Sequence, residues 1–579
     1  MQSRAQQGVQ QFLDSYTKEY VRLYTASSLA QWRANTEIRE GDTINAHAAQ
    51  MADEAMAAFT GSKANIDAAR GFLKQRGITP LQKRQLDVIL YTAAGSPQTI
   101  PDVVKARIKA ETDQTQKLYG YQYLLDGKKV STNDLDEVLR TETNPQKRLA
   151  AWEATKAIGP TLKGGLVNLR DLRNQVVQGL GYSDYFSYQV SDYGLKTPDM
   201  MKLMDGLIRD LYPLYRELHT WMRYETAKKY GQPVPNMLPA HWLPNRWGQD
   251  WSSAVTVQGL DLDAVLKAKS PQWIVENAES LYTSIGFPAL PQNFWQNSSL
   301  YPYPADSAVK KNNHASAWHM DLNQQVQSLM SVEPNAEWWE TANHELGHIY
   351  YYISYSRDAV PPLLRGGANR AYHEAVGSMM GMAAMQKPYL VGRGLIAADA
   401  KTDDVRALLK EALNSVVFIY FSAGTMSNFE KAMYTDKLPA DQFNQKWWAL
   451  ARKYQGIEPP TARGEEYCDA ATKTHINDDP AQYYDYALSY ALLYQLHNHI
   501  AKNILHQDPR ATNYYGHKEV GDFVRGILRD GASKDWRVVL KESTGDELNA
   551  RAMLEYFQPL MAWLKEQNKG RNYTLPEKM

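Results

Sequence analysis

Apolar residues recur at the three- and four-residue spacing of amphipathic helices through most of this 579-residue chain. The pattern runs from Val9 to Tyr24 and returns around 136–157, 198–229, 262–285, 403–435 and 545–567. Helix breakers separate these stretches, at Gly159-Pro160, Gly231-Gln232-Pro233, Pro361-Pro362 and Pro459-Pro460. Strand-like alternation is scarce, and only residues 232–320, which are richer in Pro, Asn and Ser, suit loops and a short strand or two. We therefore predict a mainly α fold with very little β, formed by a single large helical body without repeats or linkers.

Charge and cysteine content limit the partners and the metal ligands. The 64 basic and 64 acidic residues balance, whereas binding to a nucleic acid or to an anionic membrane needs a basic excess. With Cys468 as the only cysteine, the chain can form neither an internal disulfide nor a cysteine-based zinc site. It also lacks a run of about 18 apolar residues that could span a membrane. We expect a monomer with no nucleic-acid partner and no membrane partner.

The segment His344-Glu345-Leu346-Gly347-His348 is the feature most directly tied to chemistry. On a helix, positions i and i+4 lie on one face, so both imidazoles can bind one metal ion. Neutral imidazole nitrogens suit zinc, and Glu345, next to the first ligand, is placed to take the proton of an activated water. The competing interpretation is a helix with two incidental histidines. We predict a zinc site with His344 and His348 as ligands and Glu345 as general base.

A catalytic zinc site needs a third protein ligand and an open fourth position. About one loop later, Tyr372-His373-Glu374-Ala375 begins a run with Ala and Met that suits a helix. Glu374 is the natural third ligand and completes the His-His-Glu set of thermolysin-like peptidases, although taken alone it could equally be a surface glutamate. A third histidine soon after His348 would define another class of zinc peptidase, but Tyr352-Ile353-Ser354 does not supply one.

These segments resemble the angiotensin-converting enzyme (peptidyl-dipeptidase A) family of gluzincin peptidases, in a bacterial-type member. The likeness covers 344–349, 366–377, 314–318, 239–251, 453–456, 473–476 and 483–497. The N-terminal helices match that family more loosely. The resemblance implies one catalytic domain over 1–579, with a helical lid in 1–110 and the zinc and substrate-binding segments in 239–497. It also implies two subdomains that flank a deep active-site cleft.

The resemblance assigns roles to residues outside the zinc motif. Gln249, Lys473 and Tyr483 would bind the C-terminal carboxylate of a peptide, since an amide, an ammonium and a phenol make a charge-assisted clamp. His475 and Tyr486 would donate hydrogen bonds to the oxyanion that forms at the scissile carbonyl.

The same resemblance predicts how the substrate is held and what is released. His314 and the backbone of Ala315 would hold the substrate main chain in an extended pose. The family's carboxypeptidase relative has an arginine at the position of Gln249, which leaves room for one residue beyond the cut. Glutamine leaves room for two, so we expect the release of C-terminal dipeptides.

Three departures from the family pattern carry predictions. Asp485 stands where chloride-activated members have an arginine, and Ala451 replaces a second one, with Arg452 adjacent. A carboxylate repels an anion, so we expect activity that does not require chloride. Ser378 replaces an aspartate that orients a zinc histidine, which predicts weaker zinc binding. The family's disulfides are also absent.

The function that follows is a zinc-dependent peptidyl-dipeptidase that binds one Zn²⁺ and acts on oligopeptides with a free C-terminus. A single-residue carboxypeptidase or an oligopeptidase with the same zinc helix is the enzyme alternative, and a catalytically inactive binding scaffold is the alternative from another class. We expect a periplasmic or secreted protein whose signal sequence is absent from the given chain, with a cytoplasmic location left open.

Overall fold

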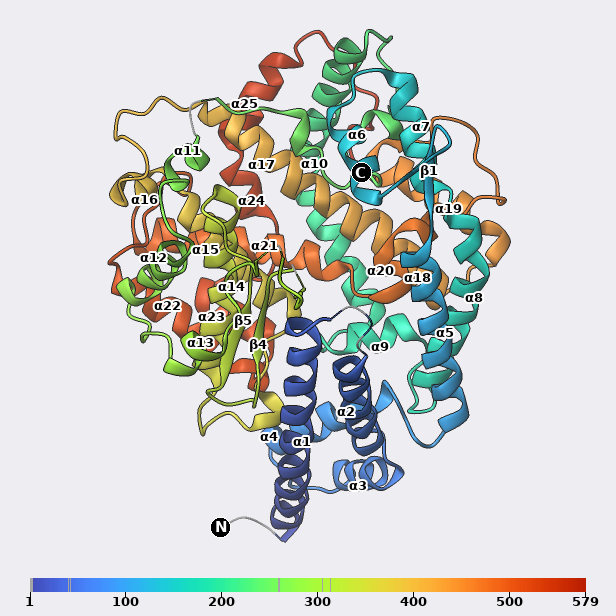
Figure 1. Ribbon diagram of the computed structural model, residues 1–579, viewed down its shortest axis with the longest axis vertical. Helices are drawn as coiled ribbons and strands as arrows, with labels where there is room; N and C mark the ends of the chain where they lie inside the picture. Colours follow the sequence, from blue (N-terminus) through green and yellow to red (C-terminus); the bar gives the residue numbers. More distant parts are fainter. Residues whose placement is uncertain (1–3, 40, 42, 259–260, 305, 313) are drawn as a thin grey trace. The chain divides into compact units, whose positions relative to one another are not determined.

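Helices form most of the computed structural model, which describes residues 4–39, 41, 43–258, 261–304, 306–312 and 314–579 (Figure 1). This confirms the predicted mainly α fold. The chain divides into two compact units, each made of three stretches. Unit 1 comprises Met1–Pro101, Leu260–Ala400 and Leu496–Leu548, and unit 2 comprises Asp102–Gly259, Lys401–Gln495 and Asn549–Met579. The predicted cleft between two subdomains, and a lid in 1–110, stay predictions.

Unit 1 contains the N-terminal helices, the helices of the metal-binding motif and one small antiparallel sheet. Its elements are α1 (Arg4–Thr36), α2 (Ile44–Thr60), α3 (Lys63–Leu73), α4 (Pro80–Ala94), α11 (Leu262–Leu266), α12 (Pro271–Ser284), α13 (Gln292–Asn297), β4 (Ser316–His319), β5 (Val326–Leu329), α14 (Ala336–Tyr355), η3 (Pro362–Leu364), α15 (Arg370–Met385), α16 (Lys387–Gly392), η8 (Ile500–Ile504), α22 (Lys518–Leu528), η9 (Gly531–Ser533) and α23 (Trp536–Thr544). Strands β4 and β5 pair in register from Ser316 opposite Leu329 to His319 opposite Val326.

The amphipathic pattern of the N-terminus explains how α1 packs. Val9, Leu13 and Tyr16 lie one helical turn apart and are buried. They join Leu86 and Ile89 of α4 in one hydrophobic cluster. Helix α4 begins where Thr79 and Gln82 exchange hydrogen bonds in a capping box, with Pro80 at the first helical position.

Unit 2 is built around one long helix and two interrupted ones. Its elements are α5 (Pro101–Gly120), β1 (Tyr123–Leu125), β2 (Lys128–Val130), α6 (Thr132–Thr141), α7 (Pro145–Lys156), α8 (Gly159–Gln178), α9 (Tyr185–Ser191), α10 (Thr197–Tyr230), β3 (Leu238–Pro239), η1 (Ala240–Trp242), η2 (Ser252–Ala254), α17 (Asp404–Ile419), the π-helix η4 (Tyr420–Met426), α18 (Ser427–Tyr434), η5 (Ala440–Gln442), α19 (Phe443–Leu450), the π-helix η6 (Ala451–Gln455), β6 (Ile457–Glu458), η7 (Ala470–Thr472), α20 (Thr474–Asp478), α24 (Arg551–Tyr556) and α25 (Gln558–Gln567). Helix α21 (Tyr484–His499) begins in unit 2 and ends in unit 1.

Two details of unit 2 differ from a simple reading of periodicity. The stretch 136–157 is two helices, because Asn144 accepts backbone hydrogen bonds at the start of α7 and Pro145 occupies its first position. The hairpin β1–β2 turns at Asp126-Gly127, where φ is positive at both residues. That pair is a typical two-residue hairpin turn and was not picked out by the helical pattern.

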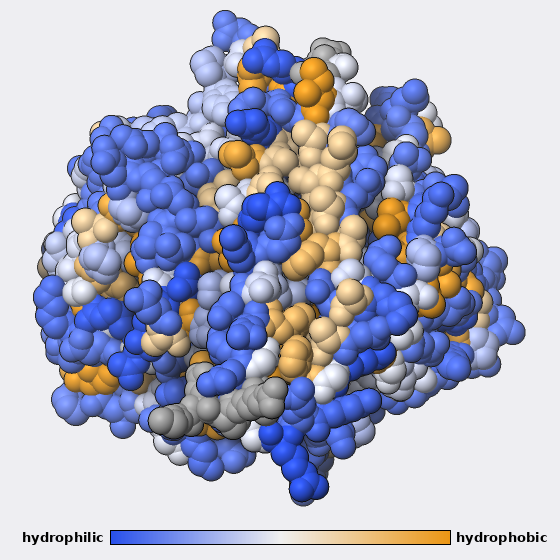
Figure 2. Space-filling model, turned by 90° about the horizontal axis from the view of Figure 1, so that it is seen from below, coloured by the Kyte–Doolittle hydropathy of each residue, from blue (hydrophilic) through white to orange (hydrophobic). Residues whose placement is uncertain are grey.

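Among the described residues, none of the helices combines the length and the apolar character that a bilayer crossing requires. The face shown in Figure 2 is largely hydrophilic and carries a band of more hydrophobic side chains.

Candidate metal centre and substrate-binding residues

Helices α14 and α15 of unit 1 carry the predicted metal ligands. Each begins at an asparagine whose side chain accepts a backbone hydrogen bond, Asn335 in α14 and Asn369 in α15. The two helices approach each other closely at two glycines. A Cβ added to Gly347 would lie 2.7 Å from the Cα of Gly377, which leaves no room for any other residue there. This close approach brings a carboxylate of α15 to the histidines of α14.

The three predicted ligands lie together. The Nε2 atoms of His344 and His348 are 3.1 Å apart. The Glu374 carboxylate lies 3.7 Å from His344 Nε2 and 3.9 Å from His348 Nε2. Ligand atoms around a tetrahedral zinc ion with bonds of about 2.0–2.1 Å are separated by about 3.3 Å. The donor set and its spacing therefore fit zinc, and His344, His348 and Glu374 form a possible metal cluster in the described residues.

Burial sets the protonation of the residues around this cluster. It lowers the pKa of His344 and of His348 to about 4, and so keeps both imidazoles neutral. Neutral imidazole is the form that binds a metal. Glu345 is only 6% exposed, and burial, followed by the charge of Glu374, raises its pKa to about 8 in the metal-free chain. A cation bound at the cluster would favour the charged form of this carboxyl and so lower its pKa again.

The outer nitrogens of both histidines have partners. Ser378 Oγ lies 3.3 Å from His344 Nδ1, the position predicted for this residue. His373 Nδ1 lies 3.1 Å from His348 Nδ1, a contact that sequence reasoning missed. If His348 binds a metal through Nε2, its Nδ1–H donates to His373. A hydroxyl and an imidazole thus take the places where zinc histidines commonly meet a carboxylate.

The predicted backbone-binding residues of unit 1 lie just before strand β4. His314 is exposed, and its Nδ1 lies 2.9 Å from the carbonyl oxygen of Ala315. Strand β4 follows at once and is tied to the metal helix, because the hydroxyl of Tyr352 in α14 donates to the carbonyl of Ala317. The structure therefore places these residues next to a strand that contacts α14.

In unit 2, the three residues predicted to bind the substrate carboxylate contact one another at a single atom. Gln249 Oε1 accepts hydrogen bonds from Lys473 Nζ at 2.9 Å and from the Tyr483 hydroxyl at 3.1 Å. Lys473 is 2% exposed and its ammonium lies 4.2 Å from the centre of the Trp247 ring. Burial, with the charges of Arg246 and Lys156, lowers the pKa of Lys473 to about 7. Two donors aimed at one oxygen are suited to bind a carboxylate.

The predicted oxyanion donors of unit 2 also adjoin each other. His475 Nε2 lies 3.4 Å from the Tyr486 hydroxyl. Tyr486 sits in the first turn of α21, which the π-helix η4 supports. Ser422 of η4 donates to the carbonyl of Tyr483 at 2.6 Å and accepts from the backbone of Ala487 at 3.2 Å. Such π-helical turns occur often at functional sites.

The residues predicted to replace chloride ligands are buried in unit 2. Asp485 is buried and accepts a hydrogen bond from the Tyr193 hydroxyl. Ala451 is buried in the π-helix η6, whereas the neighbouring Arg452 is exposed. It is therefore Ala451, and not Arg452, that faces the interior.

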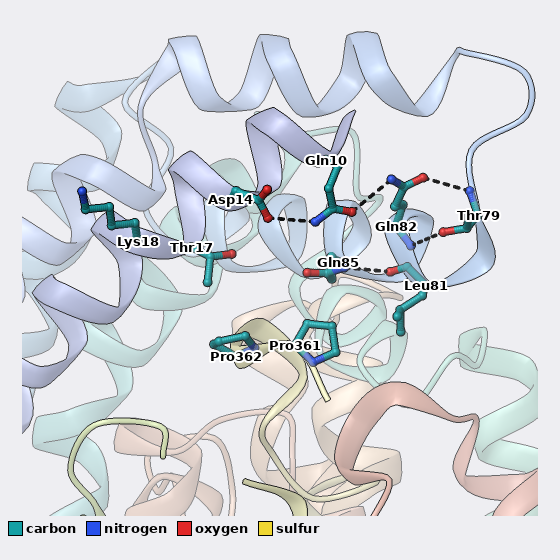
Figure 3. A pocket seen from close by; sticks show the side chains of 10 residues that line it. All are labelled: Gln10, Asp14, Thr17, Lys18, Thr79, Leu81, Gln82, Gln85, Pro361 and Pro362. Atoms are coloured by element: carbon teal, nitrogen blue, oxygen red, sulfur yellow. Dashed lines mark hydrogen bonds between the residues drawn. The ribbon is translucent and has the colours of Figure 1, made fainter. Parts of the chain in front are cut away.

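A cavity of about 590 Å³ lies elsewhere in unit 1, between α1, α4 and η3 (Figure 3). Its polar lining residues bond mainly to one another. Gln10 donates to Asp14, and Gln82 donates to Gln10. None of the predicted site residues lines this cavity.

Comparison with known proteins gives one consistent family. The family model for angiotensin-converting enzyme, peptidase M2, matches residues 3–575. The chain is 29% identical to the angiotensin-converting enzymes of Mesocricetus auratus and of Rattus norvegicus, each over 98% of this chain and 44% of that protein. It is 31% identical to the angiotensin-converting enzyme of Bos taurus over 76% of this chain and 34% of that protein. The chain thus spans less than half the length of these relatives.

Proposed function

The chain belongs to the angiotensin-converting enzyme family, and from this premise we propose that it is a zinc-dependent peptidase that releases dipeptides from the C-terminus of oligopeptides. The observation that carries the proposal is the cluster of His344, His348 and Glu374, whose ligand atoms all lie within 4.8 Å of one another. Glu345 directly follows the first of these residues. Two histidines and a glutamate leave a fourth position for water or substrate, as catalytic zinc sites do.

The chemistry divides between the metal and the protein. A zinc ion in this cluster would supply Lewis acidity to a peptide carbonyl and to the attacking water. Glu345 takes the proton from the water and returns it to the leaving amine, since its position beside His344 places a carboxylate next to the metal-bound water. His475 and Tyr486 donate hydrogen bonds to the oxygen that gains negative charge.

The cluster of Gln249, Lys473 and Tyr483 in unit 2 supports the proposed substrate class. Lys473, Gln249 and Tyr483 bind the C-terminal carboxylate of the peptide, which makes the enzyme prefer free C-termini. His314 and Ala315 hold the main chain of the same peptide. Glutamine at position 249, in place of a bulkier arginine, supports the release of two residues instead of one.

Chloride is not required in this proposal. The buried carboxylate of Asp485 opposes an anion, and the buried side chain at position 451 is uncharged. A steep rise in rate on addition of chloride at constant ionic strength would contradict this part. The periplasmic or secreted location and the monomeric state stay predictions.

Product analysis tests the proposed function. A set of peptides of known sequence, each with a free or an amidated C-terminus, is incubated with the zinc-loaded protein and the products are identified by mass spectrometry. We expect C-terminal dipeptides from the free peptides, little product from the amides, and no product after chelation until zinc is returned. Removal of single residues would favour a carboxypeptidase, and the absence of any product would favour a binding scaffold.

A further inference from the structure

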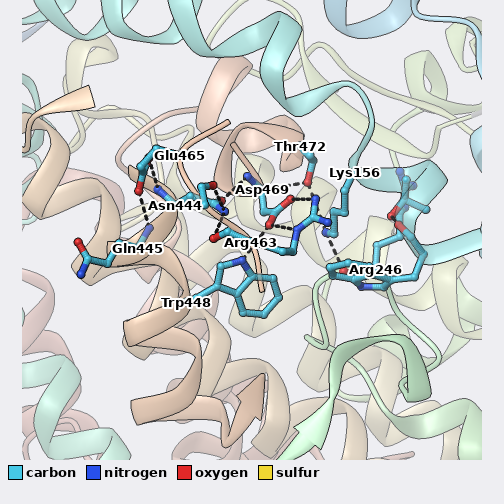
Figure 4. A network of polar contacts seen from close by, with 12 residues as sticks. Lys156, Arg246, Asn444, Gln445, Trp448, Arg463, Glu465, Asp469 and Thr472 are labelled. Carbon is cyan, nitrogen blue, oxygen red and sulfur yellow. Dashed lines mark hydrogen bonds and ion pairs between the residues drawn. The ribbon is translucent and has the colours of Figure 1, made fainter. Parts of the chain in front are cut away.

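Lys156, the last residue of α7, has a buried ammonium that the proposed chemistry does not use. Its side chain is 2% exposed. Its Nζ donates to the carbonyl of Arg246 at 2.9 Å and approaches the Thr472 hydroxyl at 3.4 Å (Figure 4). These two contacts lie on segments that are more than 200 residues apart in the sequence.

These two segments contain the residues that are proposed to bind the substrate carboxylate. Arg246 precedes Gln249 by three residues, and Thr472 directly precedes Lys473. A second bond reinforces the link, since the indole N–H of Trp247 donates to the same Thr472 hydroxyl at 3.2 Å. Lys156 thus connects the segment that contains Gln249 to the segment that contains Lys473.

The Thr472 hydroxyl, which accepts both of these hydrogen bonds, is oriented by the hydrogen bond that it donates itself. Thr472 Oγ1 donates to the carbonyl of Asp469 at 2.7 Å. A hydroxyl has one hydrogen to donate and two lone pairs, so Lys156 and Trp247 fill its remaining capacity. Asp469 is in turn held by a two-bond pair with Arg463 and by the indole of Trp448 (Figure 4). Thr472 is therefore bonded to a residue that has three further side-chain hydrogen bonds of its own.

The charges around the link leave an excess of positive charge. The carboxylate of Asp469 is engaged by Arg463, and Arg246 forms an ion pair with Asp136. Within the described part of the chain, neither Lys156 nor Lys473 has a carboxylate at ion-pair distance. Two buried ammonium groups without a counter-charge are costly, and an anion bound beside them reduces that cost.

We propose that Lys156 is a positioning residue for substrate binding: its ammonium, bonded to the Arg246 carbonyl and the Thr472 hydroxyl, holds Gln249 and Lys473 in the arrangement that binds a peptide C-terminus. This inference rests on the proposed carboxylate-binding role of those two residues. Because the carboxylate is held in both the ground state and the transition state, loss of the link raises KM and leaves kcat unchanged.

The test compares Lys156→Met with the unaltered protein on a matched pair of peptides, one with a free C-terminus and one amidated, at pH 6.5. For the free peptide we expect KM to rise about tenfold with kcat within about twofold, and for the amide we expect no change. Lys163→Met is the control, because Lys163 bonds to Glu465 and touches neither segment. Its KM for both peptides should stay within about twofold.

The outcomes separate this inference from the proposed function. If the unaltered protein cuts free and amidated peptides equally well, the carboxylate-binding role itself is wrong. If the unaltered protein prefers the free peptide, and Lys156→Met shows the same preference and the same KM for that peptide, the positioning role is overturned. Should Lys156→Met fail to fold, Thr472→Val removes the shared hydroxyl at nearly constant volume. It should raise KM for the free peptide about threefold, and an unchanged KM there would also overturn the inference.

Discussion

Lys473 offers a prediction in which binding and stability change in opposite directions. Its ammonium lies 2.9 Å from Gln249 Oε1 and is positioned to bond to a substrate carboxylate. A hydrogen bond between charged groups contributes about 1.5–3 kcal/mol, so Lys473→Met should raise KM for free peptides about 10- to 150-fold. Amidated peptides lack the carboxylate, and their KM should not change.

The same substitution should stabilise the fold. Burial lowers the pKa of Lys473 from an ordinary value of 10.5 to about 7. The folded chain therefore binds this proton less well than the unfolded chain, and stability is lost as the pH falls from about 10.5 through about 7. At pH 6 the cost of the buried charge is present in full and is at most about 5 kcal/mol. Methionine removes that cost and keeps most of the apolar contact with Trp247.

Two measurements on one set of proteins check this reasoning. Steady-state kinetics on free and amidated peptides give the KM values, and urea unfolding at pH 6 gives the free energy of unfolding. Lys163→Met, whose lysine is half-buried and paired with Glu465, should leave KM unchanged and should not become more stable. The reasoning is refuted if Lys473→Met retains the KM of the unaltered protein for free peptides, or if it is less stable than that protein at pH 6.

Three further predictions concern the metal site and the fold. Ser378→Asp should raise zinc affinity about tenfold, because a carboxylate would then accept the hydrogen bond of His344. Competition with a chelating dye measures this affinity. Weaker binding would show that the serine does not stand in for a carboxylate at this position. Gly377→Ala should lower both zinc affinity and Tm, at a cost of about 1–3 kcal/mol, since its Cβ would lie 3.0 Å from the carbonyl oxygen of His344; unchanged values would mean that the two helices separate without strain. Burial lowers the pKa of His219 and of His497 to about 4, so the unfolded chain takes up these protons first and stability falls as the pH drops from about 6.5 towards 4. Each histidine should lower the free energy of unfolding by about 2 kcal/mol at pH 5. Equal urea midpoints at pH 7 and pH 5 would contradict this.

Helical periodicity predicted the fold well where a helix is long and amphipathic. The stretch 198–229 is almost all of α10, and the run from Val9 to Tyr24 lies within α1. Periodicity failed where a local signal interrupts it. It passed over the helix start at Asn144-Pro145 and the hairpin turn at Asp126-Gly127, although both have recognisable turn or cap chemistry. The π-helices η4 and η6 depend on tertiary packing and leave no periodic signal.

The sequence could single out the three residues of the candidate metal cluster because their spacing is local. His344 and His348 are one helical turn apart, and Glu374 follows in the next helix. The positions of Lys473 and Gln249 relative to each other came only from resemblance to a family, since more than 200 residues separate them. Neither His373 nor Lys156 was singled out. A buried histidine beside a ligand and a lysine at a helix end look ordinary until the fold shows what their nitrogens touch.

The most direct test of the proposed chemistry is the hydrolysis rate of Glu345→Gln loaded with zinc. Glutamine keeps the size of the side chain but cannot take a proton, and a general base commonly contributes about 10²- to 10⁴-fold to a rate. The variant should bind one zinc per chain, as the unaltered protein should, and should cleave peptides at least about 100-fold more slowly. A zinc-loaded variant that cleaves at nearly the rate of the unaltered protein would contradict the assignment of Glu345 and the mechanism that depends on it.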